Sequence, residues 1–559
     1  MNNILSNLIF LPIIGALIIM GLGRGRDGFC RGFALIVSGV TFLLSIPLYT
    51  GFREDTAQMQ FTEHIPWIKG IGANYSLGID GISLPLVLIT TFLTVLAILA
   101  SWTAITSRVR EYTVVMLFLE SGMLGVFCAQ DLLLFYVFWE AMLIPMALLI
   151  GVWGGERRIY AAIKFVLFTM AGSVLMLVGI LVLYTKSGGM TFDLQTILGT
   201  SLPRELQTWL FLAFFVSFAI KVPLFPVHTW LPDAHVEAPT AGSVILAGVL
   251  LKMGTYGLIR FCLPLFPYAA MHYVPMISAL ALIGIVYGAL VSMVQQDIKK
   301  LVAYSSVSHL GFVVLGIFSL NAQGMNGAIL QMVNHGLSTG GLFLIVGMIY
   351  ERRHTREIED YGGLAKVVPI FSTFFLIITL SSIGLPGLNG FVGEFLILVG
   401  AYRANPTYGV IAASGVILAA VYMLWMYQRV VFGEVKHEEN RGLRDLSIRE
   451  IAILVPIVAG MLWIGVYPNA LLSKSAVSVN GVLSRIQTER TMAERRGPGI
   501  GDQEESNSEI GGAGEEMTRG SFITPQKPEK SASKHGYETA SMLLFRPPTP
   551  DPFSVKVGR

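Results

Sequence analysis

Long apolar runs separated by short polar loops recur along most of the chain. Fourteen of these runs are predicted to be membrane-spanning helices, at 4–22, 32–51, 82–101, 113–129, 131–152, 161–184, 207–226, 240–262, 272–293, 300–319, 325–349, 369–402, 408–432 and 450–470. Most contain about 20 residues, which at 1.5 Å per residue cross about 30 Å of hydrocarbon. The first run has neither a basic leader nor a small-residue cleavage motif, so we interpret it as a helix and not as a signal peptide. The pattern predicts an all-α polytopic membrane protein.

Two of the runs are interrupted by glycine and proline. The run at 369–402 is too long for one straight span and contains Gly384-Leu385-Pro386-Gly387. The run at 207–226 ends in Lys221-Val222-Pro223-Leu224-Phe225-Pro226. Broken helices at corresponding places in two halves are typical of transporters built from inverted repeats.

Basic residues are distributed unevenly between the two sets of alternate loops. One set carries eighteen Lys and Arg residues and the other six, with Arg260 counted among the six. Because basic loops remain in the cytoplasm, the first set is predicted to be cytoplasmic. With fourteen helices, both termini then lie on the outer side.

Composition excludes several classes of protein. The chain is 53% hydrophobic and 13% charged, whereas soluble domains have about 25% charged residues. An outer-membrane barrel is excluded because its strands alternate apolar and polar residues. The net charge of +3 comes with no basic face for nucleic acid. Three scattered cysteines and the lack of a glycine-rich phosphate loop favour neither a metal site nor a nucleotide site.

The character of the sequence changes after about residue 484. Residues 484–559 contain 11 basic and 11 acidic residues, with Gly, Pro, Ser and Thr making up much of the rest. Such a segment has too few apolar residues to form a core. We expect a disordered polar tail.

Four ionisable residues fall inside the predicted spans, namely Glu140, Lys221, Lys252 and Glu394. A charge at the centre of a bilayer costs about 2.5–3.5 kcal/mol, so these side chains are expected to face the bundle interior and to be functional. Burial disfavours a charged group and a nearby opposite charge favours it. A lysine whose partner approaches or retreats can therefore hold or release a proton. Structural ion pairs between helices are the alternative interpretation.

Histidines extend this set. His228 and His235 follow Lys221, and His309 and His335 lie on consecutive helices beside Ser and Asn. Each alone is more often a satisfied core histidine, but together they suit a proton wire, because imidazole both accepts and donates. Glu120, in the fourth helix, is an accessory candidate, as is His235. The spacing within helices does not favour a metal site.

Several stretches resemble a known family, the antiporter-like subunits of respiratory complex I and their cation/proton antiporter relatives. They are Asp131-Leu132-Leu133-Leu134-Phe135 with Phe138-Trp139-Glu140, Lys221 to Pro239, Ser305-Ser306-Val307-Ser308-His309-Leu310-Gly311, and Gly384-Leu385-Pro386-Gly387. The resemblance covers about residues 1–475. Some members of the family carry lysine in the second broken helix, so Glu394 narrows the resemblance to the glutamate-bearing members. The polar tail is not expected in the family.

The resemblance implies an organisation of the chain. Three N-terminal helices occupy 1–112, two inverted five-helix repeats occupy 113–262 and 263–435, the last helix lies in 436–483, and the tail occupies 484–559. It also implies that the chain has no redox cofactor, and that NADH oxidation and quinone reduction occur in other subunits. The expected partners are other membrane subunits, the flanking antiporter-like subunits above all, together with lipid. The expected location is the bacterial inner membrane.

The resemblance also implies roles for individual residues. Glu140 would pair with Lys221 and tune its proton affinity, Lys252 would be the central relay, and Glu394 would pass protons toward the outside. His228, His309 and His335 would line the polar axis with water. Two other functions stay open, a subunit of a multi-subunit sodium/proton antiporter and a structural scaffold with inert ion pairs. Sodium would favour a cluster of carboxylate and carbonyl oxygens at a broken helix, and a scaffold would tolerate Lys221→Ala.

Overall fold

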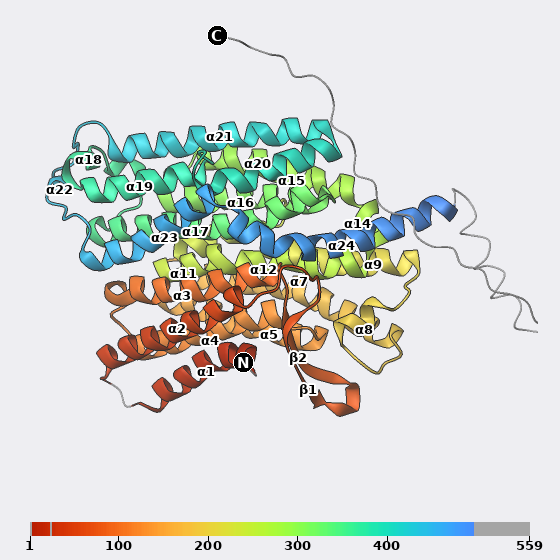
Figure 1. Ribbon diagram of the computed structural model, residues 1–559. Helices are drawn as coiled ribbons and strands as arrows, with labels where there is room; N and C mark the ends of the chain where they lie inside the picture. Colours follow the sequence, from red (N-terminus) through yellow and green to blue (C-terminus); the bar gives the residue numbers. More distant parts are fainter. Residues whose placement is uncertain (1–2, 23–24, 497–559) are drawn as a thin grey trace, which may run out of the picture. The chain divides into compact units, whose positions relative to one another are not determined.

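The fold is known from a computed structural model, which describes residues 3–22 and 25–496. In this part of the chain, twelve helices are long and apolar enough to cross a membrane. They are α1 (Ile4–Gly21), α2 (Asp27–Thr50), α3 (Ser83–Ala104), α4 (Val109–Cys128), α5 with α6 (Leu132–Trp153), α7 (Arg158–Lys186), α11 to α13 (Thr240–Leu265), α15 (Val274–Met293), α16 (Ile298–Phe318), α17 (Ala322–Arg353), α21 (Pro406–Val431) and α23 (Ile448–Val466). They pack side by side in one bundle (Figure 1). The chain is thus a multi-pass helical membrane protein.

The two remaining predicted spans are the broken ones. One is α9 (Arg204–Lys221), followed by a turn and α10 (Trp230–Glu237), and the other is α19 (Pro369–Ser382) with α20 (Asn389–Ala404). Each of the fourteen predicted segments therefore overlaps a helix, but a count of fourteen spanning helices stays a prediction, because twelve meet the criteria of length and hydropathy.

Both breaks close with the same backbone hydrogen bond. Leu224 N donates to Ala219 O over 2.8 Å, and Leu385 N donates to Leu380 O over 3.0 Å. A bond that spans five residues is typical of a helix end. Pro223 has no N–H to continue α9, and Gly384 adopts a left-handed conformation (φ 76°) that favours glycine.

One end of the bundle carries a β-hairpin, and we call it the hairpin end. Strands β1 (Gln60–Ile68) and β2 (Ala73–Ile79) pair antiparallel, joined by the short helix η1 (Lys69–Ile71). Connections α8 (Leu194–Leu198) and α14 (Pro267–His272) lie at the same end, which is on the right in Figure 1. The opposite end holds η4 (Ile358–Asp360), α18 (Leu364–Val367) and α22 (Glu438–Arg441), and we call it the basic end because the eighteen-residue set of basic loops lies there.

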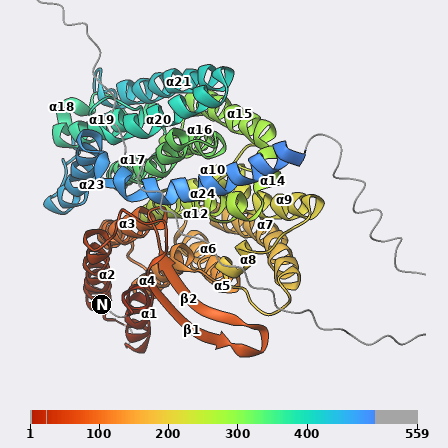
Figure 2. The same ribbon diagram turned by 45° about the vertical axis from the view of Figure 1, so that its right-hand side comes forward.

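A long helix follows the last span. Helix α24 (Asn469–Arg496) lies in front of the other helices in two views (Figures 1 and 2). Tyr49 Oη donates to Ala470 O, and Arg485 Nη2 donates to Leu198 O, so α24 covers the hairpin end. The predicted start of the tail at 484 is too early, because α24 continues through that position. The rest of the predicted tail, residues 497–559, lies outside the described residues.

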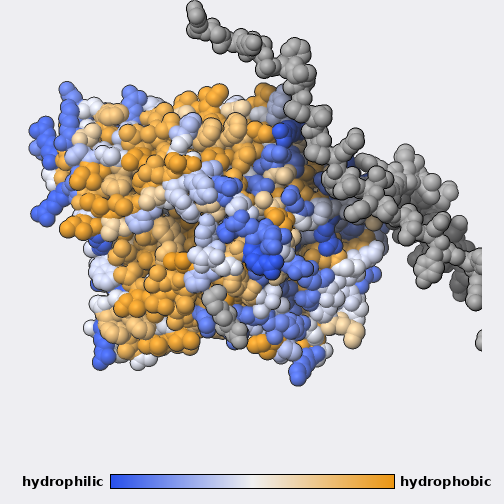
Figure 3. All heavy atoms as spheres, viewed as in Figure 1, coloured by the Kyte–Doolittle hydropathy of each residue, from blue (hydrophilic) through white to orange (hydrophobic). Residues whose placement is uncertain are grey.

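The surface is apolar over much of the bundle. Ile36, Ile163 and Ile417 are 64%, 55% and 68% exposed, as expected for side chains that face lipid. Figure 3 shows apolar residues across the left and upper parts of one face, while hydrophilic residues gather toward the lower right. A soluble protein would bury such a surface against a partner. The ionisable residues of the predicted relay, by contrast, lie inside.

Candidate functional site

Four buried groups form two hydrogen-bonded pairs that lie next to each other where the two halves of the bundle meet. Lys252 Nζ lies 2.7 Å from Nδ1 of His335, and the His335 ring lies 5.9 Å from the His309 ring. His309 Nδ1 lies 2.8 Å from Oε1 of Glu394. All four side chains are at most 4% exposed. These four residues were predicted from sequence, and the structure brings them together.

The helix that carries Lys252 deviates from α geometry on both sides of it. The span 240–265 contains π turns at η2 (Leu246–Leu250) and η3 (Leu258–Cys262), which flank α12 (Leu251–Gly257). Lys252 Nζ donates to the carbonyl of Ala247 in the first π turn. Single π turns inside α-helices are frequent at functional sites. Here the first π turn points the Ala247 carbonyl toward the ammonium group of Lys252, so the ammonium group has a hydrogen-bond acceptor without an acidic partner.

Glu394 lies one turn beyond the second break. Its Oε1 accepts from Gln331 Nε2 over 2.9 Å in addition to the contact with His309. The start of α20 is held by Asn334, whose Nδ2 donates to Asn389 O over 2.7 Å. The break therefore places Glu394 beside amide and imidazole groups of α16 and α17.

Lys221 occupies a different environment. It is the last residue of α9, and its Nζ lies 3.6 Å from Sδ of Met142, 5.3 Å from the centre of the Trp139 ring and 5.6 Å from that of Phe165. A thioether and two aromatic faces attract a cation weakly. Glu140 lies near enough to attract the ammonium group, but no hydrogen bond or ion pair between them is found in the described part of the chain. The implied pairing of Glu140 with Lys221 is therefore not a direct one here.

A third break, which the sequence analysis did not predict, lies next to Glu140. Helix α5 (Leu132–Ala141) ends one residue after it, and α6 (Leu143–Trp153) continues beyond Met142. Pro145 has no N–H for the carbonyl of Ala141, so the helix is interrupted at this point. Glu140 is half-buried, whereas Lys221 is buried. In the sequence, Pro145 was the residue that could have indicated this break.

Three other predicted residues are buried but lie outside this chain of contacts. His235 stacks on Phe343 with ring centres 4.6 Å apart, and neither ring nitrogen has a partner. His228 packs against the Tyr287 ring at 5.2 Å and its Nδ1 has no partner. Both carboxylate oxygens of Glu120 are buried without a partner. Unpaired buried polar atoms are costly, so water or a bound proton is needed at these sites.

The structure adds two cations that sequence reasoning did not assign to the site. Lys164 Nζ of α7 forms an ion pair of 2.7 Å with Asp233 of α10. Phe165, the next residue, packs on Trp230 with ring centres 5.4 Å apart and lies below Lys221. One turn of α7 thus contacts both sides of the first break. No local signal marks Lys164, because it looks like a residue near a helix end.

The second is Lys299, near the start of α16. It is buried, and its Nζ donates to Ala238 O over 2.5 Å and to Val236 O over 3.3 Å. Asp297, beside it, caps α16 by accepting from Lys299 N and Lys300 N. Asp131 caps α5 in the same way.

Arg260 also differs from its prediction. It was counted as a loop residue, but it lies in η3 and is 6% exposed. Its Nη2 lies 2.5 Å from Asp80 Oδ1. The apolar run predicted at 240–262 included this position, and only a tertiary partner makes a buried guanidinium tolerable there.

A cavity of about 530 Å³ opens at the basic end. Its lining includes Glu237, Lys299, Glu351, His354 and Arg356. His235 lies one residue from the cavity wall at Val236, and Lys299 reaches the cavity from α16. The cavity therefore comes within one residue of the buried His235 from the basic end.

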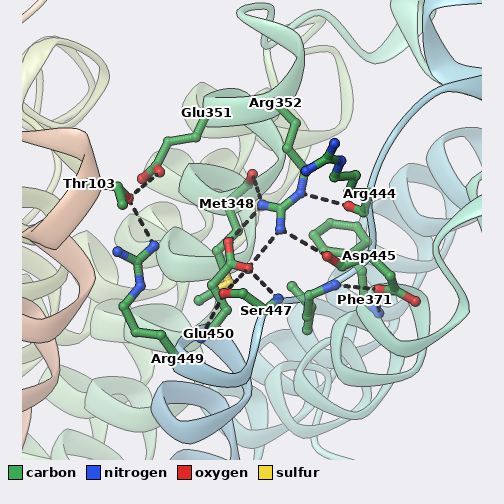
Figure 4. A network of polar contacts seen from close by, with 11 residues as sticks. Thr103, Met348, Glu351, Arg352, Phe371, Arg444, Asp445, Ser447, Arg449 and Glu450 are labelled. Atoms are coloured by element: carbon green, nitrogen blue, oxygen red, sulfur yellow. Dashed lines mark hydrogen bonds and ion pairs between the residues drawn. The ribbon is translucent and has the colours of Figure 1, made fainter.

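A polar network borders the cavity and ties four helices together (Figure 4). Arg352 donates through Nη1 and Nη2 to the two carboxylate oxygens of Glu450, each over 2.7 Å. Thr103 accepts from Arg449 over 2.8 Å and donates to Glu351 over 2.9 Å. Two-point pairs of this kind fix geometry. This end of α17 and α23 is thus anchored.

Comparison with known proteins identifies the family. Residues 129–421 match the family model described as NADH:quinone oxidoreductase/Mrp antiporter, TM, and residues 58–125 match NADH-ubiquinone oxidoreductase chain 4, amino terminus. The chain is 50% identical over 486 residues to NADH-quinone oxidoreductase subunit M of Rhodobacter capsulatus, covering 84% of this chain and 94% of that one. The chain belongs to the subunit M/chain 4 family. The resemblance to the antiporter-like subunits of respiratory complex I is thereby confirmed.

Other relatives agree. NADH-ubiquinone oxidoreductase chain 4 of Marchantia polymorpha is 48% identical over 480 residues, covering 86% of this chain and 97% of that one. A chain of respiratory complex I from Thermus thermophilus matches with a TM-score of 0.78 and 36% identity over 86% of this chain and 99% of that chain. A chain of the Mrp complex from Dietzia sp. matches with a TM-score of 0.75 at 19% identity, covering 86% of this chain and 99% of that one. The last match shows a shared fold alone.

Proposed function

We propose that the chain carries protons across the membrane as a subunit of an NADH-quinone oxidoreductase. The observation that supports this most directly is the row of two hydrogen-bonded pairs, Lys252 with His335 and His309 with Glu394, whose imidazole rings lie 5.9 Å apart. Each member can gain or lose a proton, and a water molecule between the two imidazoles would complete the path. This row of residues ends at the carboxylate of Glu394, which can release a proton toward the hairpin end.

Protons reach these four residues from the basic end. The cavity near Lys299 and the unpaired ring nitrogens of His235 lead toward Lys252. Water that fills such gaps conducts protons through hydrogen-bonded chains. Lys221 and Glu140, at the first break, act on this path through charge. When Glu140 approaches Lys221 the ammonium form is favoured, and when it retreats the proton is released.

The protein works together with other subunits in a membrane. The redox reactions take place in other subunits, and the chain itself works without a redox cofactor. In the described residues no group of three or more His, Cys, Asp or Glu side chains is arranged to hold a metal ion. Flanking antiporter-like subunits are its partners. The basic end faces the cytoplasmic side of a bacterial inner membrane, since basic loops are retained on that side, and both termini lie on the outer side.

A sodium/proton antiporter subunit is the second candidate, because a chain of the Mrp complex shares the fold. The environment of Glu394 argues against a sodium site. Its Oε1 is contacted by an imidazole nitrogen and an amide nitrogen, whereas Na⁺ requires oxygen ligands. The identity to that chain is 19%, far below the 50% identity to subunit M.

The test uses the whole complex reconstituted in vesicles. Protons moved per electron are compared between wild type, Glu140→Ala, Glu140→Asp and Lys221→Met. Both the alanine and methionine variants are expected to lower this ratio, and Glu140→Asp to retain more of it. Lys186→Met, at the exposed end of α7, is the matched control. An unchanged ratio in both Glu140→Ala and Lys221→Met would contradict the relay, and pumping that depends on Na⁺ would favour the antiporter.

A further inference from the structure

A buried ion pair closes the hairpin end of the helix that carries Lys252. The side chains of Arg260 and Asp80 are 7% and 4% exposed, and Arg260 Nη2 lies 2.5 Å from Asp80 Oδ1. Arg260 Nε donates to the hydroxyl of Tyr256 over 3.1 Å. That hydroxyl donates in turn to the carbonyl of Phe127 over 3.2 Å. The pair is thus held by three different elements.

The cluster lies in line with the relay. Lys252, Tyr256 and Arg260 follow at intervals of four residues on one continuous helix, so their side chains lie on neighbouring turns. Arg260 stands about 12 Å beyond Lys252 toward the hairpin end. A proton leaving Lys252 straight along the first half would meet Tyr256 first and the guanidinium next.

Helix α24 covers the pair from the hairpin end. Asp80 is fixed because its Oδ1 accepts from Ile82 N and Ser83 N, each over 3.0 Å. The next residue, Gly81, donates its N–H to Ser478 Oγ of α24 over 3.0 Å. A Cβ at Gly81 would collide with the α24 backbone at Lys474. Helix α24 therefore packs closely against the residue next to Asp80, and the pair is nearly shielded from solvent.

The second half has a different lining toward the same end. Helix α17 and its cap carry the neutral Gln331, Asn326 and Asn321 toward this end, and Asn326 accepts from Ser475 of α24 over 2.9 Å. In residues 3–22 and 25–492, the buried lysines and arginines are Lys221, Lys252, Arg260 and Lys299. Of these, Arg260 is the one at the hairpin end. The two halves therefore differ in buried ionised groups where they face this end, because the first has the Arg260–Asp80 pair and the contacts named in the second are amides.

We propose that Arg260 is an electrostatic seal, which prevents protons on Lys252 from leaving through the hairpin end of the first half and directs them to His335 and Glu394. A guanidinium stays charged at physiological pH, and repulsion between like charges is strong where the effective dielectric constant is low. Arginines exclude protons from membrane pores by the same physics. Asp80 positions the charge and makes its burial tolerable. This inference rests on the proposed relay and adds the direction of release.

The test is the passive proton permeability of the resting complex. Vesicles that contain the whole complex, without NADH or quinone, receive a pH step, and an internal dye reports its decay with valinomycin and K⁺ present. Arg260→Met combined with Asp80→Asn removes both charges and leaves no unpaired ion. Its leak is expected to rise by about tenfold or more, because the guanidinium no longer stands between Lys252 and the hairpin end, and a tenfold rise corresponds to a barrier lowered by about 1.4 kcal/mol.

Three further variants separate charge from packing. Arg260→Lys keeps a positive charge beside Asp80 but changes the packing, and it is expected to leak like wild type. Arg352→Met with Glu450→Gln removes a comparable pair at the basic end, and its leak is expected to stay unchanged. Arg260→Gln with Asp80→Asn also removes both charges but retains hydrogen-bonding groups. It is measured beside the methionine variant, so that the test needs only one of the two variants to assemble into the complex.

Two results would overturn the proposal. One is a wild-type leak in the assembled doubly neutral variants, which would reduce the pair to a structural contact. The other is an equally raised leak in Arg260→Lys, which would show that packing and not charge closes the path. Because the leak is measured without turnover, its outcome is separate from that of the Glu140 and Lys221 variants, on which the relay itself depends.

Discussion

The two broken helices hold charges of opposite sign in contrasting surroundings. Lys221 ends α9 among Met142, Trp139 and Phe165, and its acidic neighbour is half-buried and not in direct contact. Glu394, past the second break, is hydrogen-bonded to His309 and Gln331. A charge without a tight partner responds strongly to the approach of one. The first break is thus suited to sensing and switching, and the second to conducting.

The largest effect is expected for Lys252→Met. This substitution keeps the volume but removes the group that joins the two halves, so proton uptake should fall by about two orders of magnitude, the usual range for losing an acid–base group. The measurement is protons moved per electron in vesicles. Met253→Leu, the neighbouring buried position, is the control. Near-normal pumping in Lys252→Met would place conduction outside the polar chain.

Glu394→Gln should have the next largest effect. The amide can retain the hydrogen bonds but cannot release a proton, so pumping is expected to fall about tenfold or more. Glu394→Asp should restore part of it. The different roles of the two breaks would be contradicted if Lys221→Met and Glu394→Gln slowed the same step with the same pH dependence. A residue that switches and a residue that conducts should affect different steps.

An intermediate effect is expected at the ion pair that clamps the first break. Lys164→Met with Asp233→Asn frees α10 from α7, while Phe165 still contacts Lys221. Pumping should fall several-fold without loss of assembly, since partly exposed pairs contribute about 1 kcal/mol or less to stability. The single variant Lys164→Arg, which can keep the ion pair with Asp233, is expected to pump like wild type. Wild-type pumping in the double variant would limit the coupling at this break to Glu140.

The smallest effect concerns the attachment of α24. Glu54, in the loop after α2, forms an ion pair of 2.8 Å with Lys474, and hydrogen bonding to Lys474 lowers the pKa of Glu54. A carboxyl with a lowered folded-state pKa adds stability above its unfolded value, and that stability is lost as the pH falls through the folded value. Glu54→Gln should therefore lower the melting temperature slightly at neutral pH and not in acid. Thermal unfolding of the purified complex at both pH values is the measurement, and an equal shift at both would contradict the assignment.

Much of the site followed from the sequence because charges are rare in apolar helices. Glu140, Lys221, Lys252 and Glu394 stood out against hydrocarbon-compatible neighbours, and all except the half-buried Glu140 are buried in the structure. The breaks at Pro223 and Gly384 followed from missing N–H groups and left-handed backbone. The break after Glu140 was missed, since a single Pro145 in an apolar run looks like an uninterrupted span.

The sequence alone therefore determined a polytopic helical bundle, the places where two helices break, and most of the buried ionisable residues, because burial cost and backbone chemistry are local properties. Only the tertiary structure decided which of these groups touch. It joined Lys252 to Glu394 through two histidines, kept Glu140 apart from Lys221, and turned Arg260 from a loop charge into a buried partner of Asp80. These contacts join residues up to 180 positions apart, and such pairings depend on how helices pack.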